Sequence, residues 1–196
     1  MPALSPRRNG EATRQKLLRA ALELYTTAGF RGTTTPQIAL RAGVAEGTIY
    51  RHFSGKEALL NEVYRGAQRW ALDVITESED DRLGKARERL QRIAHRVLEG
   101  ARRDPPASRM VLQFSEERHL DQTSRGVARE VREALQQVIA AGKSDGLVRA
   151  GPADLWAGVW LAVVAFAAER VGTNEWAPDH PQAAQAVQAA WDAIKA

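Results

Sequence analysis

Apolar residues recur along the chain with the spacing of α-helices, and no stretch keeps the strict alternation of a half-buried strand. A first helix is expected over about residues 10–28, and Gly29 ends it. Phe30 follows at the position where an apolar residue contacts the last turn of a helix that ends in this way. The apolar stripe of this helix consists of Leu17, Leu18, Ala21, Leu24 and Tyr25. The pattern predicts an all-α protein.

Breaks rich in glycine, proline and acidic residues divide the rest of the chain into further helices. The fourth helix is long, runs to about Thr76 and carries Trp70 on its apolar side. The acidic residues 77–81 follow. Clustered carboxylates suit a divalent cation, but no ligand spacing repeats elsewhere, so we expect a solvated loop. Later helices are expected over about residues 83–103, 107–118, 124–141, 153–171 and 182–195, which makes about nine in total.

Residues 34–53 predict two short helices joined by a tight turn. The hydroxyl of Thr34 or Thr35 can cap the first of these helices. Pro36 suits its first turn, where the missing N–H has no helical partner anyway. Gly43 ends the helix, because glycine adopts a positive φ without steric cost.

The second short helix covers about residues 46–52. Ile49 and Phe53 lie four positions apart on its inner side, so its other side faces solvent. Ser54 and Glu57 form a capping-box pattern that starts the next helix. Two short helices across a glycine turn are the helix-turn-helix arrangement, whose second helix enters the major groove of DNA.

The residue types on the exposed side of this arrangement suit contact with DNA. Gly47 lets the backbone approach DNA closely, and Arg51 can reach a phosphate or a guanine edge. Thr48, Tyr50 and His52 can donate to phosphate, and Lys56 stands at a positive helix N-terminus. The candidate DNA-binding residues are Thr34, Thr35, Gln37, Glu46, Gly47, Thr48, Tyr50, Arg51, His52 and Lys56.

Charge supports a nucleic-acid partner. The net charge is +4, but residues 1–72 hold 11 Lys and Arg against 5 Asp and Glu, whereas residues 73–196 hold 17 against 19. This basic excess is the footprint of a nucleic-acid partner, although it also fits a membrane surface. Residues 1–9 are basic and contain proline. We expect a disordered tail there; the alternative is an arm that inserts Arg7 and Arg8 into the minor groove.

No constellation for catalysis, a cofactor or a metal stands out. The chain has no cysteine, and its four histidines lack zinc-binding spacing. Gly142-Lys143-Ser144 matches the tail of a phosphate-binding loop, but it follows a helix and the earlier glycine is missing. No secretory signal is visible, and the apolar run near residues 155–168 is shorter than the about 20 residues that span a bilayer. We expect a cytoplasmic protein that is not an enzyme and does not enter a membrane.

The string GTIYRHF followed by SGKEALL resembles the DNA-binding segment of the TetR (tetracycline-repressor) family of bacterial transcriptional regulators. Ala28-Gly29-Phe30 and the following Gly32 with its threonines fit the same pattern. The resemblance is close over about residues 12–65 and lies only in the helical layout elsewhere. It implies a helix-turn-helix DNA-binding domain at 1–53 and a helical effector-binding and dimerisation domain at 54–196.

The function implied by this resemblance is transcriptional regulation, most often repression. A homodimer would bind a palindromic DNA operator and be released by a small-molecule effector. Two other classes stay open, namely a helical protein-interaction or membrane-surface module, and a helical enzyme without a recognisable motif.

The resemblance also implies an effector pocket within the second domain, although an aromatic residue or methionine at helical spacing is usually ordinary core. The candidate pocket residues are Trp70, Ile93, His95, Val97, Met110, Phe114, Trp156, Trp160 and Phe166. The helices at 153–171 and 182–195 look like the two that pair with their symmetry mates in a four-helix dimer interface, rather than plain monomer core. The candidate interface residues are Val159, Val163, Ala183, Val187, Ala190, Trp191 and Ile194.

Two residues depart from the family pattern. Many relatives carry serine or threonine where this chain has Ala45, so the second short helix loses about 1 kcal/mol of capping unless another group serves. The carboxylate of Glu46 can interact favourably with the helix dipole or accept a hydrogen bond from a cytosine amino group, but it repels phosphate. These departures affect which operator is bound rather than DNA binding itself.

Overall fold

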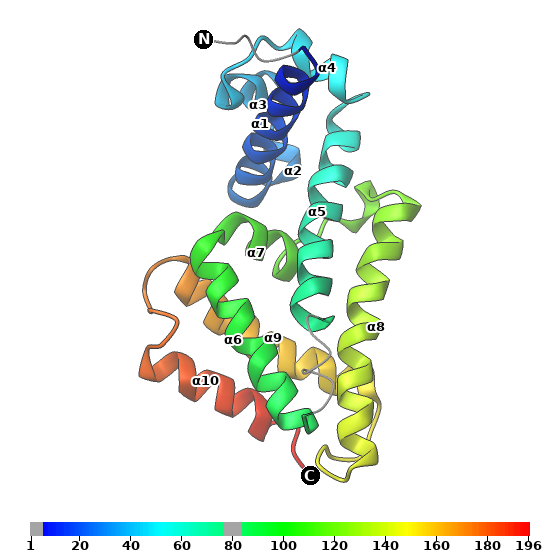
Figure 1. The fold of residues 1–196 in the computed structure, drawn as a ribbon, viewed down its shortest axis with the longest axis vertical. Helices are drawn as coiled ribbons and strands as arrows, with labels where there is room; N and C mark the ends of the chain where they lie inside the picture. Colours follow the sequence, from blue (N-terminus) through cyan, green and yellow to red (C-terminus); the bar gives the residue numbers. More distant parts are fainter. Residues whose placement is uncertain (1–5, 77–83) are drawn as a thin grey trace.

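The protein consists almost entirely of α-helices (Figure 1). The computed structural model describes residues 6–76 and 84–196. A short 3-10 turn, Glu117–His119, precedes α8, and an isolated β-bridge pairs Val148 with Lys195. The helices are α1 (Pro6–Thr27), α2 (Gly29–Gly32), α3 (Thr35–Ala42), α4 (Gly47–His52), α5 (Lys56–Thr76), α6 (Ala86–Arg103), α7 (Pro105–Leu112), α8 (Gln122–Ser144), α9 (Ala153–Gly172) and α10 (Pro181–Asp192). The expectation of an all-α protein is confirmed.

The helix boundaries differ from the sequence expectation in three places. Helix α1 begins at Pro6, so the expectation of a disordered tail is wrong for residues 6–9; residues 1–5 and the side chains of Arg7 and Arg8 lie outside the described part. The turn after Gly29 continues as the extra one-turn helix α2. The helix expected over 107–118 divides into α7 and the separate 3-10 turn. The acidic residues 77–81 also lie outside the described residues.

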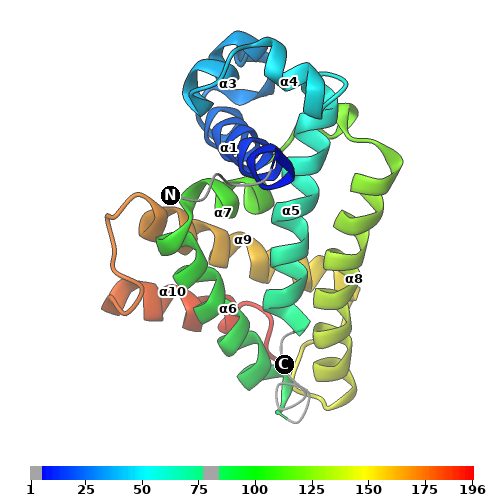
Figure 2. The ribbon, with the colours of Figure 1, turned by 45° about the horizontal axis from the view of Figure 1, so that its top comes forward.

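Helix α5 connects the two ends of the molecule (Figures 1 and 2). Helices α1 to α4 gather around its amino-terminal half, at the top of Figure 1. Helices α6, α8 and α9 surround its other half, and α10 packs on α9. Because one unbroken helix runs through both groups, it fixes where the helix-turn-helix lies relative to the larger bundle.

Two hydrophobic cores lie along α5. Leu59, Leu60 and Val63 of α5 belong to the amino-terminal core, and Val74 belongs to the other core. The amino-terminal core also takes residues from later in the chain: Met110 of α7, Ala128 of α8, and Leu120 between these helices. The division into domains at residue 53 stays a prediction, since the packing of this core continues past that point.

Ion pairs also fasten α1 to the rest of the molecule. Arg14 of α1 lies 3.0 Å from the carboxylate of Glu62 on α5, and this hydrogen-bonded guanidinium lowers the pKa of Glu62. Arg19 donates from Nη1 to both carboxylate oxygens of Asp104, each at 2.7 Å. Asp104 also caps α7 by accepting from the backbone N–H of Ala107. The position of α1 is therefore tied to α5 and to α7.

The buried side of α10 faces its own chain. Within the carboxy-terminal core, Ala183, Ala190 and Ile194 are fully buried, and Val187 and Trp191 nearly so. The expectation that these five residues form a dimer interface is therefore wrong. Their apolar side packs against α6 and α9 of the same chain, so no second copy is needed to cover it.

Helix α9 is the most apolar element. It is long and apolar enough to cross a membrane by length and composition, with a mean hydropathy of 1.4. This is weak evidence for a span, because a core helix of a folded domain passes the same test. Trp160, Val164 and Ala167 of α9 are buried against α6, α8 and α10, whereas Leu155 and Phe166 are half exposed. One side of α9 is thus core and the other is uncovered.

Two glycines of α8 provide a test of this packing. At Gly142 an added Cβ would lie 2.6 Å from Cβ of Ala86 and 2.9 Å from Cγ2 of Val148, whereas at Gly126 it would meet nothing within 4 Å. Gly142→Ala should lower the free energy of unfolding, since overpacking costs about 1–3 kcal/mol. Gly126→Ala should raise it by up to about 1 kcal/mol through helix propensity. Urea unfolding of both variants measures this, and an equal gain for both would contradict the packing at Gly142.

Candidate nucleic-acid interface

The first helix of the helix-turn-helix, α3, begins with a complete capping box. Thr34 donates its backbone N–H to Oε1 of Gln37 at 2.8 Å, and its hydroxyl accepts from the backbone N–H of Gln37. Pro36 occupies the first turn. At the other end Gly43 adopts φ +68°, and its N–H bonds back to the carbonyls of Ala39 and Leu40. The local signals read from the sequence are therefore confirmed at both ends of α3.

The second helix, α4, is held by its inner side. Ile49 is fully buried and Phe53 nearly so, as expected. No side chain caps the start of α4, which agrees with the loss expected at Ala45. Glu46 instead accepts from the hydroxyl of Thr35 at 3.3 Å. The buried side chains fix α4 against the amino-terminal core, and the other side of the helix is exposed to solvent.

The exposed side of α4 is joined to the start of α3. The hydroxyl of Tyr50 lies 3.2 Å from that of Thr35, although the Tyr50 side chain is 57% exposed. Thr35, Glu46 and Tyr50 thus form one polar cluster. It spans both helices and gathers three of the expected DNA-binding residues.

Arg51 and Gly47 are the least constrained residues of this surface. Arg51 is exposed and makes no hydrogen bond or ion pair with any residue in the described part of the chain. An added Cβ at Gly47 would meet nothing within 4 Å, so packing inside the protein does not require glycine there. Thr48 and His52 are half-buried beside them. The surface therefore offers a free guanidinium and an unobstructed backbone.

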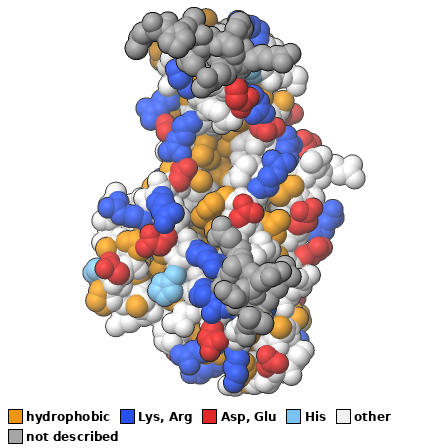
Figure 3. Space-filling model, viewed as in Figure 1, with side chains coloured by type: hydrophobic (Ala, Val, Ile, Leu, Met, Phe, Trp, Pro, Cys, Tyr) orange, Lys and Arg blue, Asp and Glu red, His pale blue; other side chains and the backbone are white. Residues whose placement is uncertain are grey.

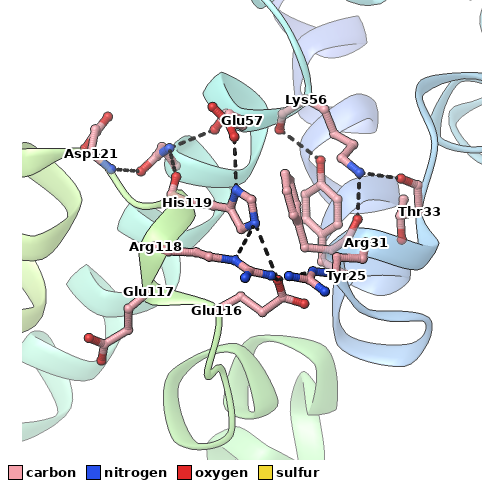
Figure 4. Close-up of polar contacts among 12 residues, drawn as sticks. Tyr25, Arg31, Thr33, Lys56, Glu57, Glu116, Glu117, Arg118, His119 and Asp121 are labelled. Atoms are coloured by element: carbon pink, nitrogen blue, oxygen red, sulfur yellow. Dashed lines mark hydrogen bonds and ion pairs between the residues drawn. The ribbon is translucent and has the colours of Figure 1, made fainter.

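Lys56 differs from the expectation of a free phosphate-binding group (Figure 4). Its ammonium donates to the backbone carbonyls of Phe30 at 2.7 Å and Thr33 at 2.8 Å. It also lies 4.1 Å from the centre of the Phe30 ring, a cation–π distance. These carbonyls offset the unfavourable position of a positive charge at the N-terminus of α5. Lys56 therefore fastens α5 to α2 and to Thr33 directly after it, and a phosphate contact through its remaining N–H stays a prediction.

The connection between α7 and α8 packs on the same region and was not expected from the sequence (Figure 4). The ring of His119 lies 4.4 Å from that of Phe30, and its Nδ1 is 3.0 Å from the carboxylate of Glu57. Asn61, buried in α5, donates to the carbonyl of His119 and accepts from the N–H of Asp121. The capping box expected from Ser54 and Glu57 is wrong, since α5 begins at Lys56 and Glu57 turns to His119.

The expected pocket residues separate into several places. Trp70, Ile93, Val97 and Trp160 line a cavity of about 170 Å³ between α5, α6, α8 and α9. Trp70 and His95 line a larger open groove of about 710 Å³ between α1, α5 and α6. The other four residues expected in the same pocket lie elsewhere. The sequence therefore identified five of the nine residues as lining one or the other hollow.

Met110 and Phe114 line a separate hollow beside the end of α1, because α7 turns them toward the amino-terminal core. Trp156 donates from Nε1 to the carbonyl of Ala150 at the start of α9. Phe166 is 50% exposed and packs on Trp176 with ring centroids 5.7 Å apart. The expectation that these four residues form one effector pocket with the others is therefore wrong. Among the described residues no group of three or more His, Cys, Asp or Glu is placed to hold a metal ion.

Comparison with known proteins agrees with the geometry of the helix-turn-helix. Residues 17–63 match the family described as bacterial regulatory proteins, tetR family. The chain is 43% identical over 58 residues to the HTH-type transcriptional regulator SrpR of Pseudomonas putida, which is 30% of this chain and 27% of that protein. It is 42% identical over 53 residues to the HTH-type transcriptional repressor KstR2 of Rhodococcus jostii, 27% of this chain and 26% of that protein. The chain therefore aligns with about a quarter of the length of these curated relatives.

Solved structures match over nearly the whole chain. A TetR family transcription regulator from Marinobacter aquaeolei VT8 has a TM-score of 0.76 at 23% identity, covering 96% of this chain and 98% of that one. A structure described as a SmeT–triclosan complex has a TM-score of 0.64 at 19% identity, covering 94% and 92%. At these identities the likeness concerns the fold, and the named relatives are regulators rather than enzymes. Residues 17–63 therefore match the tetR family of bacterial regulatory proteins, and nearly the whole chain shares the fold of a solved TetR family transcription regulator.

Proposed function

We propose that the protein is a DNA-binding transcriptional regulator that acts in the cytoplasm as a homodimer on a palindromic operator. The observation that carries this proposal is the α3–turn–α4 unit. Its inner side is buried through Ile49, while its outer side holds the unpartnered guanidinium of Arg51. In the helix-turn-helix arrangement this outer side enters the major groove. The name of KstR2 as a repressor supports repression as the direction of control.

The dimer surface that we propose is the uncovered side of α9. Its large apolar residues, Leu155 and Phe166, are 51% and 50% exposed. The smaller Gly158 and Ala162 lie between them at helical spacing and are exposed as well. Val159 and Val163 are half-buried at the edge of this stripe. A two-fold axis through the stripe would bury it and would set the spacing of the two α4 helices.

Control by a small molecule is the third part of the proposal. The cavity of about 170 Å³ between α5, α6, α8 and α9 is the proposed effector site. A relative in fold, SmeT, is described in complex with triclosan, which supports a ligand-responsive role. An effector must prefer the conformation that does not fit the operator, because equal affinity for both conformations shifts nothing. Helix α5 lines this cavity and also begins beside α4, so it is the proposed path of the response.

Lys56→Ala should affect folding before it affects DNA binding. The substitution removes two charge-assisted hydrogen bonds to backbone carbonyls, each of a class worth about 1.5–3 kcal/mol. We expect a lower melting temperature together with weaker DNA binding. If Lys56 also contacts phosphate, the salt slope of DNA binding falls by about 0.9. Circular-dichroism melting and a titration at several salt concentrations measure the two effects. An unchanged melting temperature would show that Lys56 does not fasten α5.

Arg51→Ala should weaken operator binding without loss of stability, since the exposed guanidinium makes no hydrogen bond or ion pair with any described residue. A bidentate contact to guanine is worth about 1–3 kcal/mol of discrimination. The operator is first selected from random duplexes, and single-base variants are then compared by gel shift. Arg129→Ala, an exposed arginine on α8, is the control and should bind like the parent. An equal loss on every base variant would move Arg51 from base reading to phosphate contact.

Leu155→Asp should yield folded monomers, because it introduces a charge into the proposed dimer stripe without touching either core. Leu40→Asp is the matched control, since Leu40 is 83% exposed on α3 and far from the stripe in sequence and in the fold. Sedimentation should give a dimer for the parent and for Leu40→Asp, and a monomer for Leu155→Asp. The monomer should bind the palindrome much more weakly, since two linked binding domains gain by effective concentration. A dimeric Leu155→Asp protein would disprove this interface.

A further inference from the structure

Trp70 of α5 forms a wall shared by two hollows. On one side lies the cavity of about 170 Å³ between α5, α6, α8 and α9. On the other side lies the open groove of about 710 Å³ between α1, α5 and α6. Val74, one turn further along α5, also lines both. The inner cavity is thus separated from the outer groove by two side chains, of which the indole is the larger.

The indole of Trp70 packs against Gly100 of α6, where the absence of a side chain leaves room for the ring. A Cβ added at Gly100 would overlap Cζ2 and Cη2 of the indole. Glycine therefore lets the ring lie directly against the backbone of α6. On its other side the ring faces the groove, so outward movement meets open space while movement toward α6 does not. Trp70 is a wall that can be displaced in one direction.

The inner cavity is almost wholly apolar. Ile93 and Val97 of α6, Leu135 of α8 and Trp160 of α9 line it and are buried. Its charged lining residues, Arg132 and Asp154, are exposed and of opposite sign. Among the described lining residues no buried cation or anion is available to pair with a charged ligand, and an unpaired charge in such surroundings is costly. The lining therefore favours an uncharged molecule.

The size of the cavity further narrows the class of ligand that it can hold. A cavity of about 150 Å³ lined by aliphatic and aromatic side chains binds benzene. At about 170 Å³ this cavity suits a molecule of one or two fused rings.

The outer groove has a different character. Its floor carries Leu18 and Val63, and charged residues such as Arg103 and Glu99 line it as well. Figure 3 shows apolar side chains in the hollow below the amino-terminal unit, with charged side chains on both sides.

We propose that the inner cavity takes an uncharged, largely hydrocarbon molecule of one or two fused rings, and that Trp70 sets the upper size limit by closing the cavity toward the groove. This inference rests on the proposed effector-responsive function and names the ligand class of that site. A ligand that extends from the cavity toward α1 must push the indole into the groove. There it meets the floor that includes Leu18 and Leu22 of α1, which belongs to the DNA-binding unit.

The test compares three probes on the purified full chain without DNA. Naphthalene fits the inner cavity, N-phenyl-1-naphthylamine adds a third ring, and 1-naphthoate adds a negative charge. Calorimetry follows naphthalene and 1-naphthoate, and probe fluorescence follows N-phenyl-1-naphthylamine. The parent should bind naphthalene at least tenfold more tightly than either of the other two. Failure of naphthalene to bind, or equal binding of 1-naphthoate, would overturn the proposed ligand class.

The role of Trp70 is tested by joining the two hollows. Trp70→Ala should raise the affinity for N-phenyl-1-naphthylamine at least tenfold, and Trp70→Phe should give an intermediate gain. Trp156→Ala is the control, since that indole is not among the residues lining either hollow, and it should leave the affinity unchanged. Circular dichroism verifies that each variant is folded. An unchanged affinity in folded Trp70→Ala would overturn the size limit, and the probe comparison on the parent holds even where a variant unfolds.

Gel shift on the selected operator separates this inference from the proposed function. Normal operator binding by a parent that takes up no naphthalene would overturn only the ligand class. If the parent protein binds naphthalene but shows no specific DNA binding, only the proposal of a DNA-binding regulator is overturned.

Discussion

The structure depends on the burial of one helix by two cores at once. Helix α5 contributes Leu59 and Leu60 to the core under the helix-turn-helix and Val74 to the core of the larger bundle. Burying such side chains is worth about 1.5–3 kcal/mol each, so neither end of α5 is free to leave its core. A rigid helix anchored at both ends transmits displacement along its length. In the proposed response to an effector, a change in packing around Val74 would therefore be passed along α5 to the segment that follows α4.

Polar contacts reinforce this constraint where α5 begins. The ammonium of Lys56 binds the carbonyls of Phe30 and Thr33, and the ring of Phe30 also contacts His119 from the α7–α8 connection. The buried amide of Asn61 joins α5 to the same connection through two backbone groups. A positive charge that looked available for DNA is thus largely used inside the protein. The DNA-binding unit is consequently held by the larger bundle from two directions, through α5 and through residues 119–121.

The surfaces that the proposed function would use lie at different places on the molecule. Arg51 and Tyr50 are exposed at one end, and the apolar stripe from Leu155 to Phe166 is exposed on α9. Between these surfaces Trp70 separates a largely apolar cavity from an open groove next to α1. The proposed DNA surface is therefore separate from the other two, whereas the dimer stripe and the effector cavity share Gly158 of α9. Helix α5 lies next to both the DNA surface and the cavity.

The amino-acid sequence by itself determined the elements whose signals are local. The cap at Thr34, the left-handed turn at Gly43 and the inward side of α4 at Ile49 each depend on residues a few positions apart, and all were predictable. So was most of the helical layout, because helical periodicity is visible along a single chain. The likeness of GTIYRHF to a known DNA-binding segment added the function class.

Only the tertiary structure decided what each exposed-looking side chain meets. The partners of Lys56 lie 23 and 26 residues away in the sequence, and His119 and Glu57 are 62 residues apart. No local sequence pattern predicts contacts between residues so far apart. The apolar side of α10 could be covered by its own chain or by a second copy. Helical periodicity indicates that one side of a helix is buried, but it does not indicate which element packs on that side. Packing settled this by placing Trp191 inside and leaving Phe166 outside. The shape of the cavity beside Trp70 likewise exists only when α5, α6, α8 and α9 come together.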